Sequence, residues 1–276
     1  SMKENKLINK MEAERLLAFC NNSSPLFITG AVSVGMLNMP HVGSLLLICH
    51  IAAGISVGFF FKFIFSYKKK VSMLFSKESI AKGILLESNV KKHDSKTNIS
   101  LKDLGSSFGN AIKNSVITLL VIGGFIIMFS VIISLLIESG VLGAFSGLLY
   151  SLLKFTRLPK ELFLCFSCGI IEITTGLRML CSLENIPLNV QLIGVSTILG
   201  WGGISVHMQI LSIINNAGLS MKPYLLGKFM QSLLAGLYTL ILLSAARNIS
   251  LPASIIFKYF NVNTKHINTW FHYFLY

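Results

Sequence analysis

Charged and polar side chains interrupt three apolar stretches of the sequence, and they are the candidates for chemistry. In residues 162–183, Glu172 and Arg178 stand six positions apart with Gly176 between them. Neighbours on one helix face are three or four positions apart, so the two charges do not share a face of a continuous helix. Because a charge is costly in apolar surroundings, we interpret Arg178 as an anion-binding residue and Glu172 as a proton or cation partner. A structural ion pair that fixes this segment is the alternative.

The second interruption is a run of small polar residues that ends at Pro25. Amide and hydroxyl groups here lie beside an apolar helix that stops and starts again. A helix that begins at Pro25 exposes free N–H groups and a positive dipole end, which favour carboxylates. An ordinary N-cap is the alternative, because proline suits the first turn of a helix. The candidate residues of this run are Asn21, Asn22, Ser23, Ser24 and Thr29.

The third interruption is glycine-rich and lies within residues 188–214. Gly202 and Gly203 permit close backbone approach or positive φ. His207 points away from Ser205 and Gln209, which lie one turn apart, and it either binds a ligand or serves as a packing residue. His50 allows the same two interpretations. The full set of predicted substrate-binding residues is Asn21, Asn22, Ser23, Ser24, Thr29, Glu172, Thr174, Thr175, Arg178, Gly202, Gly203, Ser205, His207 and Gln209.

The amino-acid composition indicates the class of protein that carries these residues. Of 276 residues, 53% are hydrophobic and only 13% are charged, too few to coat a soluble globule. The net charge of +13 then serves to orient the chain against the membrane and its lipids rather than to bind nucleic acid. The sequence has no metalloprotease, P-loop or paired CxxC motif. We therefore expect an integral membrane protein that is not an enzyme and needs no cofactor or metal; the coupling ion stays open.

Hydropathy divides the chain into spans and one long basic loop. Clean helical spans of the length that a bilayer requires lie at 43–65, 115–137 and 223–246. Residues 66–114 carry ten lysines against four acids, which places this loop in the cytoplasm. The expected parts are a first repeat at 1–65, the basic loop at 66–114, connecting helices at 115–157, a second repeat at 158–250 and a tail at 251–276.

The interrupted helices occur twice, about 180 residues apart, and each precedes a clean span. The charge pattern makes the second unit inverted relative to the first, as in many secondary transporters. This result holds whether 162–183 crosses the membrane or forms a re-entrant hairpin. The predicted fold class is therefore an all-α polytopic transmembrane protein with inverted repeats that contain broken helices or re-entrant hairpins.

Two signatures resemble the YlbJ (SpoVV) family of sporulation integral membrane proteins. They are residues 14–37, with the Asn21–Pro25 break, and the pair formed by Gly169–Gly176 and residues 202–211. The resemblance implies the nucleoside-recognition, or gate, domain. It also implies carriage of dipicolinic acid across the outer forespore membrane. Family members have a longer N-terminal region, so we expect this chain to be truncated at its N-terminus.

We therefore predict a secondary carrier of a small organic anion, with Arg178 neutralising the substrate and the two breaks cradling it. A nucleoside or other small-solute carrier is one alternative. A non-transporting protein of spore assembly, which recruits a partner through residues 66–114, is another. The expected partners are the anion and membrane lipid, and a homo-oligomer is compatible with the sequence.

Overall fold

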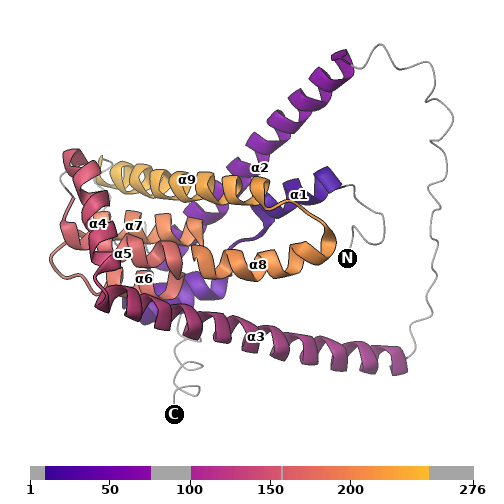
Figure 1. Ribbon diagram of the computed structural model, residues 1–276, viewed down its shortest axis with the longest axis horizontal. Coiled ribbons are helices and arrows are strands. Elements are labelled where there is room, and N and C mark those ends of the chain that lie inside the picture. The colour runs from indigo at the N-terminus through magenta and orange to yellow at the C-terminus, as the bar shows by residue number, and fades with distance from the viewer. Residues whose placement is uncertain (1–9, 76–100, 157, 249–276) are drawn as a thin grey trace. The chain divides into compact units, whose positions relative to one another are not determined.

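The computed structural model describes residues 10–75, 101–156 and 158–248, and every regular element in these ranges is a helix (Figure 1). The elements in chain order are α1 Lys10–Cys20, the π-helix η1 Phe27–Met36, α2 Val42–Phe75, α3 Leu101–Glu138, α4 Val141–Leu152, the short 3₁₀ turn η3 Lys154–Thr156, α5 Lys160–Ile171, α6 Ile173–Cys181, α7 Leu188–Trp201, α8 Gly203–Ala217 and α9 Met221–Asn248.

The chain forms two compact units. One comprises residues 1–59 and 125–276, and the other comprises residues 60–124. The second unit contains the end of α2 and the first part of α3. Every candidate site residue belongs to the first unit, so the site can be described within that unit alone.

Within the described ranges, four helical segments are long and apolar enough to cross a membrane: Val42–Phe63, Gly105–Glu138, Leu188–Ser212 and Met221–Ala245. Each exceeds the roughly 20 residues that a hydrocarbon core requires. Three of them coincide with the predicted clean spans. The fourth combines α7 with most of α8 and therefore contains the glycine-rich break. The prediction of a helical membrane protein is confirmed at this level.

The basic loop is shorter than predicted. The α2 helix continues to Phe75 and α3 already begins at Leu101, so both ends of the predicted 66–114 loop are helical. Residues 64–75 contain no glycine or proline, and lysine is a good helix former. Consecutive lysines make this part of the helix favour water over lipid, but they do not end the helix. Residues 76–100 and the predicted tail at 251–276 lie outside the described residues.

The segment 162–183 is a helical hairpin rather than one straight helix. Its legs are α5 and α6, and the turn between them is the single extended residue Glu172. A Cβ atom on Gly176 would collide with the backbone of Gly169 and would lie 3.1 Å from the Cys165 carbonyl oxygen. Glycine at position 176 therefore lets the legs touch backbone to backbone, and the segment turns back on itself as in the re-entrant interpretation.

Helix α9 contacts both α7 and α1 (Figure 1). On the α7 side, Ser232 donates a hydrogen bond to the Thr197 carbonyl at 2.8 Å. On the α1 side, a Cβ atom on Gly227 would lie 2.6 Å from the Ala18 carbonyl oxygen. Small residues allow this close packing, as is usual between membrane helices. The ends of α1 and α7, where the two breaks occur, are thereby brought to one helix.

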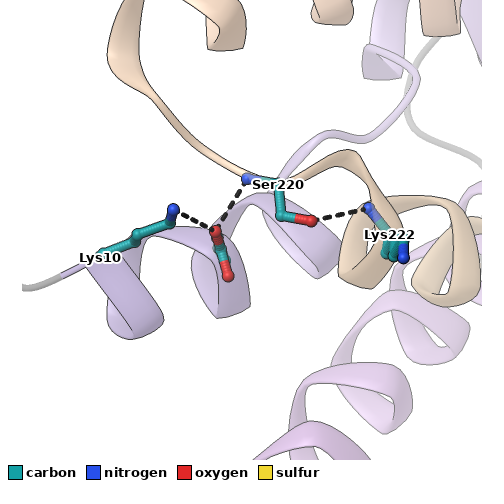
Figure 2. Close-up of polar contacts among 4 residues, drawn as sticks. Lys10, Ser220 and Lys222 are labelled. Carbon is teal, nitrogen blue, oxygen red and sulfur yellow. Dashed lines mark hydrogen bonds and ion pairs between the residues drawn. The ribbon is translucent and has the colours of Figure 1, made fainter.

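A polar contact also joins the start of α1 to the start of α9. Glu14 accepts a hydrogen bond of 2.8 Å from the Ser220 backbone N–H and lies 3.9 Å from the Lys10 ammonium (Figure 2). The Ser220 hydroxyl in turn accepts a bond of 3.4 Å from the Lys222 N–H. These bonds satisfy backbone donors that the beginning of a helix leaves free, and they hold α1 in register with α9.

We predict that Gly176→Ala destabilises the hairpin, because the added methyl group collides with the α5 backbone. Overpacking of this kind costs about 1–3 kcal/mol, measurable as a lower midpoint of thermal unfolding in detergent. Gly143→Ala in α4 is the matched control, because a Cβ atom at Gly143 meets nothing within 4 Å. An unchanged midpoint for Gly176→Ala would show that the legs do not touch.

Candidate substrate-binding site

The first break separates α1 from the helical turn that begins at Pro25. Ser24 is the N-cap, since its hydroxyl accepts a hydrogen bond of 3.1 Å from the Phe27 N–H. Thr29 donates to the Pro25 carbonyl at 2.8 Å within the same helix. Ser24 therefore acts as the N-cap of this helical turn, and Thr29 bonds within the same turn. The residues of this run that reach other helices are Asn21, Asn22 and Ser23.

The second break depends on two consecutive glycines. Gly202 and Gly203 have φ values of 88° and 82°, a region that residues with a Cβ atom rarely occupy. A Cβ atom on Gly203 would also lie 3.0 Å from the Ile173 nitrogen and 3.2 Å from the Ile171 carbonyl oxygen. The break between α7 and α8 therefore packs directly against the turn of the α5–α6 hairpin.

Glu172 caps α6 at this turn. Its side chain is fully buried, and its two carboxylate oxygens accept hydrogen bonds of 2.9 and 2.6 Å from the backbone N–H groups of Thr174 and Thr175. The Thr175 hydroxyl lies 3.2 Å from that of Ser130. A carboxylate held by two backbone donors at a helix N-terminus is electrostatically compensated where it stands.

Arg178 lies on the same short helix but is exposed. In the described part of the chain it forms no ion pair with Glu172. The structure therefore places the predicted anion-binding arginine and its predicted partner in separate environments, one at the surface and one in the hairpin turn.

The buried cation of this region is Lys228 of α9, which is only 2% exposed. Its ammonium group donates hydrogen bonds of 2.9 Å to the Asn21 carbonyl and 2.9 Å to Oε1 of Gln231. Its Cε lies 3.8 Å from where a Cβ atom of Gly202 would stand. Lys228 therefore contacts the first break directly and lies against the second. No carboxylate of the described residues forms an ion pair with it.

Gln231 extends the contact from Lys228 towards α2. Its amide nitrogen donates to Oδ1 of Asn22 at 2.6 Å and lies 3.4 Å from Nε2 of His50. The same His50 nitrogen accepts a hydrogen bond of 3.2 Å from the Ser23 backbone N–H. The first break is thereby attached to α2 as well as to α9.

Tyr224 extends the contact in the other direction, towards α8. Its hydroxyl accepts a hydrogen bond of 3.0 Å from the Asn21 side-chain amide and lies 3.1 Å from Nδ1 of His207. The His207 ring packs edge-to-face on Trp201, with centroids 4.5 Å apart, and the indole N–H donates to the Ile170 carbonyl at 3.1 Å. A continuous line of polar contacts thus runs from α2 through α9 and the first break to α8, and the ring contact with Trp201 connects α8 to the hairpin.

Two predicted residues remain on α8. Ser205 is buried, and its hydroxyl has no hydrogen-bond partner among the described residues. Gln209 is half-buried one turn further along. Both lie on the helix that begins at the second break, so the structure keeps them beside the contact line without placing them in it.

Sequence reasoning missed the three residues of α9 that join the breaks: Tyr224, Lys228 and Gln231. They stand at spacings of four and three and therefore share one helix face. The signal was present, because a single lysine inside an otherwise clean membrane span is costly and marks a functional position. Among the described residues, no group of three or more His, Cys, Asp or Glu side chains could hold a metal ion.

A buried polar line at two interrupted helices, in a chain whose described residues include four candidate spans, defines a polytopic membrane protein with an internal polar site. The chain is 31% identical over 274 residues to the sporulation integral membrane protein YlbJ of Bacillus subtilis (strain 168). The match covers 98% of this chain and 66% of the length of that protein. The chain is a homologue of that protein, in agreement with the family resemblance of its two signatures. No family model matches it, and no solved structure matches it.

We predict that Glu172→Gln lowers the thermal stability, because glutamine keeps one acceptor and turns an amide N–H group towards the backbone donors. Loss of a charge-assisted hydrogen bond costs about 1.5–3 kcal/mol. Glu184→Gln, at an exposed position, is the matched control. Equal unfolding midpoints for the two variants would mean that Glu172 does not cap α6.

Proposed function

We propose that this protein is a secondary carrier of a small organic anion, and that Lys228 and the two helix breaks form its binding site. The observation that supports this is the buried ammonium group between the breaks, which has two neutral acceptors and no carboxylate partner in the described chain. An unpaired charge at such depth is costly. An anionic substrate would supply the missing partner.

The backbone around Lys228 favours the same ligand. Helix α8 begins at Gly203, next to the break that Lys228 lies against, and the helical turn at Pro25 follows the break that Lys228 contacts. The N-terminus of a helix carries a partial positive charge and free N–H groups. Two such ends beside one ammonium group would stabilise a carboxylate.

The direction of α1 supports an inverted repeat. Ala18 of α1 contacts Gly227 of α9, and four residues further along each segment Asn22, just past the end of α1, contacts Gln231. The two helices therefore run in the same direction where they touch.

Helix α7 runs the opposite way along α9. Gly200 packs against Ser232, whereas Thr197, which precedes Gly200, packs against the later residue Gly236. Since α1 is parallel and α7 antiparallel to the same helix, we propose that α1–η1–α2 and α7–α8–α9 are inverted repeats. Inverted repeats with broken helices allow alternating access by movement of one repeat against the other.

In this arrangement the site is closed, since Lys228 is bonded to the Asn21 carbonyl and to Gln231. The bond to the Asn21 carbonyl joins the repeats. A substrate carboxylate that replaces the Asn21 carbonyl would loosen the first break from α9, so substrate binding and repeat movement would be coupled.

The name of the Bacillus subtilis relative describes it as an integral membrane protein of sporulation. We propose dipicolinate, the solute implied by the family signatures, as the substrate of this chain and the outer forespore membrane as its location. A compact aromatic dicarboxylate fits one ammonium group flanked by two helix N-termini. No step of this proposal requires covalent chemistry, a metal or a cofactor.

We predict that the purified protein binds dipicolinate and that Lys228→Met weakens binding. Loss of a buried charge partner costs about 2–5 kcal/mol, roughly a 30-fold or larger rise in Kd by isothermal titration calorimetry. Arg178→Met removes the same charge from an exposed site and should leave Kd nearly unchanged.

The result that would contradict this assignment is equal affinity in Lys228→Met and the wild type. Competition by uridine rather than by dicarboxylates would instead indicate a nucleoside carrier. Uptake of labelled dipicolinate into proteoliposomes, compared between the two variants, separates binding from transport.

A further inference from the structure

Three buried side-chain atoms near the breaks have no hydrogen-bond partner among the described residues: Nδ1 of His50, Nε2 of His207 and Oγ of Ser205. Their side chains are 0%, 4% and 1% exposed, respectively. Buried polar atoms are nearly always hydrogen-bonded in folded proteins, so a group of three in one region requires an explanation.

The hydrogen bonds of Tyr224 bear on which His207 nitrogen carries the proton. The Tyr224 oxygen accepts from the Asn21 amide at 3.0 Å and lies 3.1 Å from Nδ1 of His207, and we infer that its single hydrogen is donated to Nδ1. A phenol has only one hydrogen to donate, and a neutral imidazole has one N–H group and one bare nitrogen. Since Nδ1 is the acceptor, Nε2 is the N–H group, and it is the atom that lacks a partner.

His50 is fixed in the opposite tautomer. The Ser23 backbone N–H donates to Nε2 of His50 at 3.2 Å, and the Gln231 amide nitrogen lies 3.4 Å from the same atom. Both neighbours are donors, so Nε2 accepts. The proton of a neutral His50 ring therefore resides on Nδ1, which is again the atom without a partner.

These two donors lie at the ends of one polar line. It leads from His50 through Gln231 to Lys228 and, on the other side, through Asn21 and Tyr224 to His207. Lys228 also has a third N–H bond beyond the two that are used. The groups of this line that remain without a hydrogen-bond partner are therefore N–H donors. The Ser205 hydroxyl, on the helix that begins at the second break, can donate as well.

We propose that His50 and His207 are specificity-determining residues, each held as a neutral N–H donor on one side of Lys228. Ser23 and Tyr224 are the positioning groups that fix the tautomers. The preferred ligand is an anion with at least two separate acceptor groups and no donors of its own. This inference rests on the proposed anion-binding function and specifies which side chains select the anion.

The tautomers can be tested without any ligand. In protein labelled with ¹⁵N-histidine, the nitrogen chemical shifts distinguish a protonated ring nitrogen from a bare one, and His→Gln variants assign the signals. We expect Nδ1–H for His50 and Nε2–H for His207. Tyr224→Phe should change the His207 signals and leave those of His50 in place. The opposite tautomer, or a doubly protonated ring, at either residue would overturn the assignment.

Binding of dipicolinate tests the role of the two donors. We expect His50→Leu and His207→Leu each to raise Kd about tenfold or more, the usual effect of losing a hydrogen bond to a charged acceptor. His50→Asn and His207→Gln, whose amide N–H groups can replace Nδ1–H and Nε2–H, should recover part of the affinity. The exposed His41 supplies the control His41→Leu, which should leave Kd unchanged.

Selectivity gives a second readout. Pyridine-2,6-dicarboxamide has the shape of dipicolinate but carries N–H donors, and we expect it not to compete. Competition by the diamide, or wild-type affinity in both leucine variants, would overturn this inference while leaving anion binding intact. Absence of dipicolinate binding to the wild type would overturn the proposed function together with this inference.

Discussion

The arrangement of this protein depends on one buried charge. Lys228 stands inside a membrane span, and its ammonium group is satisfied by the Asn21 carbonyl and the Gln231 amide rather than by a carboxylate. The Asn21 carbonyl lies beyond the end of α1, so it lacks the bond that a helical carbonyl receives from the residue four positions later and is free to accept from Lys228. The break after α1 thus supplies an acceptor for the lysine of α9.

The breaks are tolerated because protein covers them. Unpaired backbone groups are expensive at membrane depth unless they are buried in protein or line a polar cavity. The hairpin turn at Glu172 packs against Gly203, and the side chains of His50, Tyr224 and Gln231 bond to the first break or its neighbours. Glycine at 176 and 203 is essential to this cover, because each permits a backbone-to-backbone contact that a methyl group would prevent.

In the proposed carrier, the same contacts would close the site and would supply the groups that a solute meets. Lys228 bonds to the first break, and the outer nitrogens of His50 and His207 have no partner within the described chain. The free energy of leaving buried donors unsatisfied favours any ligand that satisfies them. The proposed site would be selective because neighbouring groups would fix its donors before the ligand arrives.

The sequence by itself determined the all-helical membrane class, three of the four candidate spans, the positions of both breaks and the family resemblance, because hydropathy and helix interruption are local properties of the chain. Only the tertiary structure decided that 162–183 turns back at Glu172, that Arg178 faces outward, and that Lys228 joins the breaks. These features depend on contacts between residues up to about 200 positions apart in the sequence, and no local pattern records which helices become neighbours.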